Sequence, residues 1–185
     1  MSEKEKMLSG GLYLADLDRE LYDERIKCKN LCHKFNELSP EKVDERKSLI
    51  KELFGQTGEK FWIEPSFWCD YGYNIKIGEN FYVNHNCVIL DPAPVSFGEN
   101  VFIGPNCGFY TAGHPLDFET RNKGLEFAKP ITIGNNVWIG GNVCVMPGVT
   151  IGDNVVIGAG SVVVKDIPSN VAAVGNPCKP IKSLL

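Results

Sequence analysis

The stretch IGNNVWIGGNVCVMPGVTIGDNVVIGAGSVV, residues 133–163, places an aliphatic residue at every sixth position. These residues are Ile133, Ile139, Val145, Ile151, Ile157 and Val163. A helix repeats every 3.6 residues and a strand every two, whereas a short strand followed by a tight turn repeats every six. The spacing therefore predicts a β-solenoid in which roughly eighteen residues, three hexads, complete one triangular turn.

The same register continues upstream, so the coil is expected to start near Ile75. Its aliphatic or aromatic positions are Ile77, Val83 and Ile89, and, after a two-residue insertion, Phe97, Ile103 and Phe109. Four positions after eight of the hexad residues in the two stretches comes a small or β-branched residue that should point inward. These are Cys87, Val101, Cys107, Val137, Val143, Val149, Val155 and Ser161. Asn80, Asn100, Asn136 and Asn154 fall at turns, where residues that tolerate positive φ are needed. A β-sandwich would instead show alternation with irregular loops.

Composition limits the class of protein. At 185 residues with 43% hydrophobic residues, the chain is long enough for one main domain with a small appendage. A net charge of -4 without a basic run argues against a nucleic-acid partner. The apolar runs are too short for a membrane span, and the charged N-terminus lacks the apolar core of a signal peptide. A cytoplasmic location is expected.

The cysteines fit neither a disulfide framework nor a zinc ribbon. There are seven, an odd number without a CxxC pair, and we expect small buried hydrophobes. They are Cys28, Cys32, Cys69, Cys87, Cys107, Cys144 and Cys178. A nucleophilic cysteine is the less favoured alternative, because none lies beside a histidine or a basic cluster in sequence.

Residues 1–57 are charged and Leu-rich, and they predict a two-helix cap for the open end of the solenoid. Asp18 should cap the first helix, and Ser39-Pro40-Glu41 should start the second, which stops at Gly55. The expected apolar face of the first helix consists of Leu21, Tyr22, Ile26, Leu31 and Phe35, and that of the second of Val43, Ile50, Leu53 and Phe54.

Residues 58–185 are expected to form the solenoid domain, with a tail at 166–185. Its repeat is interrupted at 110–130, yet Phe109 and Ile133 are separated by 24 residues, a multiple of six. A loop should therefore project from one corner without disturbing the coil. Long loops on rigid scaffolds commonly carry binding or catalytic residues.

Only three histidines are available for chemistry. His33 falls in the first predicted helix and is expected at the surface, and His85 is most simply a turn residue. His114 lies between Gly113 and Pro115, where the coil gives way to the loop. A restricted backbone beside a cleft makes it the strongest candidate for a functional histidine.

Several motifs in their order resemble the maltose and galactoside O-acetyltransferases. They are Asp70-Tyr71-Gly72-Tyr73-Asn74-Ile75, Asn84 with Asn86, Gly113-His114-Pro115, the segment from Pro130 to Gly140, and Gly175-Asn176-Pro177. The resemblance covers nearly the whole chain, including the N-terminal helices. It implies an all-β solenoid, a left-handed parallel β-helix with a helical cap, assembled as a homotrimer with active sites between subunits. It also implies acetyl-CoA as co-substrate, a sugar acceptor and no required metal.

The resemblance also assigns roles to residues. His114 would be the general base in direct attack of a sugar hydroxyl on the thioester, helped by Asn84 and by the Gly141 N–H. The acceptor-side positions would be Asp16, Arg25, Asp70, Asn84, Asp91 and Glu126. The coenzyme positions would be Gly141, Ala159, Val164, Lys165, Lys179 and Lys182. Pro92 stands where some relatives have a second Asp, which puts the contact of Asp91 and the identity of the sugar in doubt. Glu126 could orient the His114 ring.

Three alternatives stay open at the level of sequence. The acceptor could be a xenobiotic or a serine-like molecule. A γ-carbonic-anhydrase-like zinc protein shares the solenoid but needs three converging histidines, and His33 falls in the cap. A catalytically silent scaffold would not need His114 and Asn84.

Overall fold

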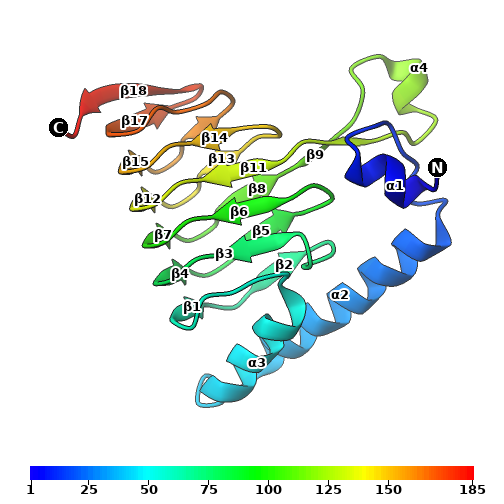
Figure 1. Ribbon diagram of the computed structural model, residues 1–185, viewed down its shortest axis with the longest axis horizontal. Helices are drawn as coiled ribbons and strands as arrows, with labels where there is room; N and C mark the ends of the chain where they lie inside the picture. Colours follow the sequence, from blue (N-terminus) through cyan, green and yellow to red (C-terminus); the bar gives the residue numbers. More distant parts are fainter.

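The computed structural model describes residues 1–185 as a three-sided solenoid of parallel strands with its two longest helices at one end (Figure 1). One side is a seven-stranded sheet of β1 (Phe61–Ile63), β4 (Phe81–Val83), β7 (Val101–Ile103), β12 (Val137–Ile139), β15 (Val155–Ile157), β17 (Val171–Gly175) and β18 (Cys178–Ser183). The second side is a five-stranded sheet of β2 (Phe67–Cys69), β5 (Cys87–Leu90), β8 (Gly108–Tyr110), β13 (Cys144–Val145) and β16 (Val162–Val163). The third is a four-stranded sheet of β3 (Ile75–Ile77), β6 (Val95–Phe97), β11 (Ile131–Ile133) and β14 (Thr150–Ile151).

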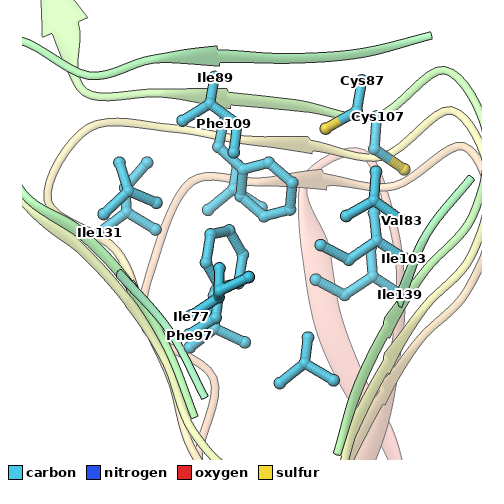
Figure 2. Packing of buried hydrophobic residues seen from close by; sticks show 14 of the residues in the cluster. Ile77, Val83, Cys87, Ile89, Phe97, Ile103, Cys107, Phe109, Ile131 and Ile139 are labelled. Atoms are coloured by element: carbon cyan, nitrogen blue, oxygen red, sulfur yellow. The ribbon is translucent and has the colours of Figure 1, made fainter. Parts of the chain in front are cut away.

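The hexad residues form the core inside the solenoid, as the sequence predicts. Figure 2 shows Val83, Ile103 and Ile139 stacked on one wall, with Cys87 and Cys107 beside them. All eight residues predicted for the small inward position are buried. Equivalent residues of successive coils stack at the strand spacing of about 4.8 Å. The apolar side chains of each coil are therefore buried by those of the neighbouring coils.

The turns at the corners depend on asparagine. The predicted turn residues Asn80, Asn100, Asn136 and Asn154 all have positive φ, between 53° and 57°. Their side chains also connect the coils, since Asn80 Nδ2 donates to Asn100 Oδ1 at 2.9 Å and Asn100 Nδ2 to Asn136 Oδ1 at 3.2 Å. An asparagine therefore supplies both the left-handed backbone and a bond between coils.

The coil begins earlier than the expected Ile75. Phe61 of β1 and Phe67 of β2 already occupy buried inward positions six residues apart. The six-residue register is hard to follow here, because Cys69 replaces the aliphatic residue that pairs with Ile89 and the next register residue, Ile77, comes eight positions later. The early coils also contain twenty residues, from Tyr82 to its partner Phe102, whereas the later coils contain the predicted eighteen, as from Trp138 to Val156.

The N-terminal region contains three helices rather than two: α1 (Glu3–Leu8), α2 (Arg19–Glu37) and α3 (Val43–Leu53). Asp18 caps α2 as predicted, accepting from Leu21 N–H at 2.9 Å. The expected start of α3 at Ser39-Pro40-Glu41 is wrong, because these residues form a turn and the helix begins at Val43.

The buried face of α2 also differs from the prediction. Tyr22 and Ile26 are 51% and 41% exposed. The buried residues of α2 are Leu21, Cys28, Cys32 and Phe35. Several helix residues share one core with the solenoid, and the division into domains 1–57 and 58–185 stays a prediction.

The interruption and the tail complete the fold. The predicted loop contains a hairpin of β9 (Ala112–Gly113) and β10 (Phe127–Ala128) with α4 (Phe118–Arg121) at its tip. The tail leaves the coil later than expected, because β17 still pairs in parallel with β15, and β18 then folds back antiparallel on β17. None of the helices combines the length and apolarity needed to span a bilayer, and the cytoplasmic location stays a prediction.

Candidate active site

Eight of the thirteen predicted site residues lie in turns at two corners of the solenoid. We call the turns from the seven- to the five-stranded sheet the first corner, and those from the five- to the four-stranded sheet the second corner. Asn84, Gly141 and Ala159 belong to the first corner. Asp70, Asp91, His114, Val164 and Lys165 belong to the second corner. A strand such as the four-residue β5, about 13 Å long, separates the two corners in each coil.

A polar cavity of about 150 Å³ opens beside the second corner. It collects four of the predicted acceptor-side residues: Asp16, Arg25, Asp70 and Glu126. They come from the segment before α2, from α2, from the turn after β2 and from the loop. Residues separated by more than a hundred positions in sequence thus line one cavity.

Arg25 organises the helical side of this cavity. Its guanidinium donates to Tyr71 Oη at 3.0 Å, to the Ala15 carbonyl at 3.1 Å and to Asp16 Oδ1 at 3.1 Å. The Arg25 side chain is largely buried, whereas that of Asp16 is 91% exposed. The exposed carboxylate therefore keeps capacity to accept hydrogen bonds from a ligand.

Asp70 and Asp91 have different environments. Asp70 lines the cavity, and its burial raises its pKa, opposed by Arg25 and Lys29. Asp91 is fully buried, and its carboxylate accepts from the backbone N–H groups of Asp70, Tyr71 and Gly72 at 2.7–3.0 Å.

The predicted acceptor contact of Asp91 is therefore not available in this structure. Its carboxylate oxygens face backbone donors, and it positions Asp70 from behind. Burial raises the pKa of Asp91 to about 7, although the three backbone donors oppose the shift. The neighbouring Pro92 lines the cavity instead.

Glu126 joins the loop to the N-terminal segment. Tyr13 and Glu126 exchange two backbone hydrogen bonds, of 3.1 and 3.0 Å, and Tyr13 Oη donates to Glu126 Oε2 at 3.0 Å. No hydrogen bond joins Glu126 to the His114 ring, so a direct contact does not support the expected orienting role of Glu126. The neighbouring carbonyl of Leu125 contacts the ring instead, at 3.1 Å from His114 Nδ1.

His114 follows β9 at the base of the loop and is exposed. A carbonyl oxygen can only accept a hydrogen bond, so the contact with Leu125 requires the hydrogen to be on Nδ1. Nε2 of the neutral ring then carries the lone pair and can take a proton. His33 is an exposed residue of α2, and His85 contacts the Pro65 carbonyl at the first corner.

The first corner offers hydrogen-bond donors. Asn84 Oδ1 accepts from the His85 N–H at 2.7 Å, which leaves the Asn84 amide group without an acceptor in the chain. The Gly141 N–H likewise has no acceptor within the chain, whereas those of Gly140 and Asn142 donate to backbone carbonyls at 2.8 Å. Both donors can therefore bond to a ligand oxygen.

Close packing makes glycine necessary near this donor. A Cβ at Gly104 would lie 2.6 Å from the Gly141 nitrogen, and a Cβ at Gly141 would lie 3.2 Å from the Pro105 carbonyl oxygen. The Gly141 amide is thus held firmly by the coil below it.

The predicted coenzyme residues are not brought together within one chain. Gly141 and Ala159 lie on the first corner, and Val164 and Lys165 on the second. Lys179 and Lys182 are exposed residues of β18. Ala159, Val164 and Lys165 are also exposed. These positions are therefore spread over two corners and the last strand of the chain.

Besides Pro92, four residues that line the polar cavity were not among the predicted site residues: Tyr13, Ala15, Lys29 and Tyr71. Two of them had a usable signal. Lys29 lies one helical turn after Arg25, and Tyr71 follows Asp70. The largest cavity, of about 690 Å³, is elsewhere, between α2 and α3, and contains none of the predicted residues.

Family models match three parts of the chain. The maltose acetyltransferase hexapeptide capping motif matches residues 6–58. The bacterial transferase hexapeptide (six repeats) matches residues 130–165, and the hexapeptide repeat of succinyl-transferase matches residues 94–114. A Saccharomyces cerevisiae protein that is provisionally named an acetyltransferase is 55% identical over 184 residues, covering 100% of this chain and 94% of the relative.

Solved structures match over the whole length. The maltose O-acetyltransferase from Clostridium difficile 630 is 51% identical, with a TM-score of 0.99, and covers 100% of this chain and 98% of its own. A galactoside acetyltransferase in complex with coenzyme A is 48% identical, with a TM-score of 0.96 and coverage of 100% and 92%. A hexapeptide acetyltransferase from Vibrio cholerae, complexed with acetyl coenzyme A, is 41% identical, with a TM-score of 0.92 and full coverage of both chains.

Proposed function

The chain belongs to the maltose and galactoside O-acetyltransferase family, and from this we propose that it transfers acetyl from acetyl-CoA directly to a sugar hydroxyl, at sites between subunits of a homotrimer. Its fold is the left-handed β-helix of the hexapeptide acetyltransferases, it is an acyltransferase, and acetyl-CoA is its co-substrate. The acceptor, the role of His114 and the assembly are the proposed parts.

The division of the site between two corners is the observation that carries the proposal. If the five-stranded sheets of three copies face a threefold axis, the first corner of each copy meets the second corner of the next. The outer face of this sheet suits such burial, because it carries no charged side chain. Its outward residues are Trp68, Val88, Leu90, Tyr110, Cys144 and Val162. The four-stranded sheet presents Lys76, Ser96, Thr132 and Thr150 and suits solvent.

The orientation of His114 supports a general-base mechanism. With Nδ1 donating to the Leu125 carbonyl, Nε2 takes the proton of the acceptor hydroxyl while its oxygen attacks the thioester carbonyl carbon. A C–O ester bond forms as the C–S bond breaks. The proton then passes from Nε2 to the departing sulfur, so no acyl-enzyme is required.

The first corner of the neighbouring copy would stabilise the transition state. Negative charge develops on the thioester oxygen during attack, and the free Gly141 N–H is a suitable donor for it. The amide group of Asn84 supplies a second free donor. Both are held by the coil before substrate binds, which reduces the reorganisation needed during reaction.

The polar cavity supports a polyhydroxylated acceptor. Asp16, Asp70 and Glu126 offer carboxylate oxygens to vicinal hydroxyls, while Arg25 and Lys29 offer donors. The cavity lies on the same corner as His114, so an acceptor bound there can present a hydroxyl to Nε2.

Subunit complementation tests the shared site. His114→Ala and Asn84→Ala chains are each expected to be weakly active, but a trimer containing both has one interface with Asn84 from one chain and His114 from the other. Co-refolding the two variants at equal amounts should restore about a quarter of the native activity, since three quarters of random trimers are mixed and each has one intact site in three.

The assay is acetyl-CoA-dependent thiol release with a panel of sugars, amines and serine. No gain over the separate variants would show that each site is built within one chain. Turnover of serine or amines in preference to every sugar would instead favour the non-sugar acceptor.

A further inference from the structure

Three cysteine side chains converge where the helical cap meets the first coil. Cys28 and Cys32 lie one turn apart on α2, and Cys69 is the last residue of β2. Cys69 Sγ is 3.5 Å from Cys28 Sγ and 3.8 Å from Cys32 Sγ, and all three sulfur atoms lie within 4.8 Å of one another. All three residues are at least 97% buried.

We propose that Cys28, Cys32 and Cys69 form a binding site for one soft, thiolate-preferring metal ion. Sulfur atoms bound at about 2.3 Å to a common ion are about 3.7–4.0 Å apart, for tetrahedral or trigonal geometry. The two closest separations, 3.5 and 3.8 Å, are near this range without a change of backbone. None of the three cysteines is among the residues proposed for catalysis, acceptor binding or coenzyme binding.

The helix supplies two of the ligands at a suitable spacing. Residues four apart project from the same face of an α-helix, so Cys28 and Cys32 both point towards the coil. Cys69 approaches from β2, which lies at the edge of the five-stranded sheet. A bound ion would therefore fasten α2 to the first coil.

The chemistry of the site selects the metal. The ligands are three sulfur atoms without an imidazole or carboxylate, which favours Cu(I) or Zn(II) over harder ions. Three thiolates complete a trigonal site for Cu(I), whereas Zn(II) needs a fourth ligand such as water. Each thiol that binds releases its proton to solvent, and the metal keeps its oxidation state.

The structure also provides a route for the ion. Cys28 lines a cavity of about 210 Å³ between α2 and the turn after β2, together with Glu24, Tyr71 and Tyr73. The cavity lies next to the cluster, and it can admit an ion and hold a water as fourth ligand. The Cys28 thiol at present donates to the Cys69 carbonyl at 3.3 Å, which orients it towards Cys69.

Metal retention by the full-length, reduced protein tests the proposal. The protein is incubated without oxygen with excess Cu(I) in one arm and Zn(II) in the other, and is then separated from free metal. Metal content per chain, sulfur-to-metal charge-transfer absorbance for Cu(I), and the thermal midpoint are measured. We expect retention of about one ion per chain in at least one arm, with a raised thermal midpoint.

Matched variants identify the ligands. Cys32→Ser and Cys28→Ser each remove one ligand with little change in volume, and retention should fall at least about tenfold in both. Cys178→Ala removes a buried cysteine of β18 and should retain metal like the native protein. Retention in only one arm supports the site and names its metal.

Equal retention by the native protein and Cys32→Ser overturns the proposal. Retention by neither metal arm overturns it as well. The measurements do not use the acetyltransferase reaction, so their outcome is separate from that of the proposed function.

Discussion

The two corners of the solenoid are built on different plans. Turns of the first corner are short and alike, and Asn86, Asn106 and Asn142 repeat a positive φ of 58–63° in successive coils. The second corner carries the 111–130 loop and the contacts with the N-terminal segment. A repeated corner fixes backbone donors such as Gly141, whereas an interrupted corner can vary the side chains that contact an acceptor. Separating the two would let specificity change without moving the proposed oxyanion donor.

A substitution that prevents neighbouring copies from assembling should have the largest effect on activity. Val162→Glu places a charge on the outer face of the five-stranded sheet, where burial against a second copy would desolvate it. We expect loss of the trimer by light scattering and loss of nearly all activity.

Thr132→Glu is the matched control on the exposed face of the four-stranded sheet, and it should stay trimeric and active. A Val162→Glu protein that remained a fully active trimer would mean that another sheet faces the axis. Phe102→Glu would then test the seven-stranded sheet, whose outer face carries exposed aromatic residues.

Removing the base of the second corner should have the next largest effect. His114→Ala is expected to lower kcat by about 10²–10⁴, the usual contribution of a positioned general base. Affinity for acetyl-CoA, measured by equilibrium binding, should change little, because the ring is proposed to contact the attacking hydroxyl and not the coenzyme. His85→Ala, at the first corner, should keep near-native kcat. Comparable losses in both variants would contradict the assignment of proton transfer to the second corner.

Displacing the donor of the first corner should have a moderate effect. In Gly141→Ala the new Cβ would lie 3.2 Å from the Pro105 carbonyl oxygen, so the turn must shift by a few tenths of an ångström. Loss of a whole oxyanion donor typically costs about 10²–10³ in rate. A displaced one should therefore lower kcat/KM for acetyl-CoA about 10- to 100-fold, while acceptor KM stays the same. Gly11→Ala, whose Cβ meets only ordinary contacts, is the control, and equal kinetics in the two variants would locate the donor elsewhere.

The smallest expected effect is on the free energy of unfolding. It concerns Asp91, which accepts three backbone hydrogen bonds at the second corner. Below about pH 4 the Asp91 carboxyl is protonated in both states, and between about pH 4 and 7 the unfolded chain loses this proton while the folded protein retains it. Ionisation of Asp91 therefore lowers the free energy of unfolding as pH rises through this range.

Asp91→Asn should be less stable by about 1–3 kcal/mol at pH 4, because the amide cannot accept from all three backbone donors. It cannot ionise, so the difference in unfolding free energy should narrow towards pH 7. Denaturant unfolding at both pH values measures this difference. A gap that widens with pH would show that the backbone donors hold Asp91 ionised throughout.

The sequence predicts the repeated parts of the molecule better than the interrupted ones. Hexads repeat a single local rule, so the inward residues and the asparagine turns are confirmed. Both depend only on spacing along the chain. The start of α3 was misplaced because Ser39 and Pro40, usual signals of a helix start, here belong to a turn.

For the candidate site, the sequence indicates which residues belong to it better than it indicates the contacts that these residues make. The resemblance to the O-acetyltransferases assigned Asp16, Arg25, Asp70 and Glu126 to the acceptor side, and in the structure these four residues line one cavity. The sequence could not show that Asp91 turns inward to three backbone donors, or that Cys28, Cys32 and Cys69 meet. Such contacts join segments about 20–40 residues apart and are decided by packing between the cap and the coil.

The backward fold of β18 has a consequence for assembly along the solenoid axis. A parallel stack ends in an open strand edge, and exposed edges can recruit further chains into fibres. Antiparallel β18 covers this edge of β17, and its own outer side carries Lys179, Pro180 and Lys182. Proline lacks an N–H donor and lysines repel one another, so another strand is discouraged from pairing there. β18 thus protects this edge of the seven-stranded sheet against pairing with a strand of another chain.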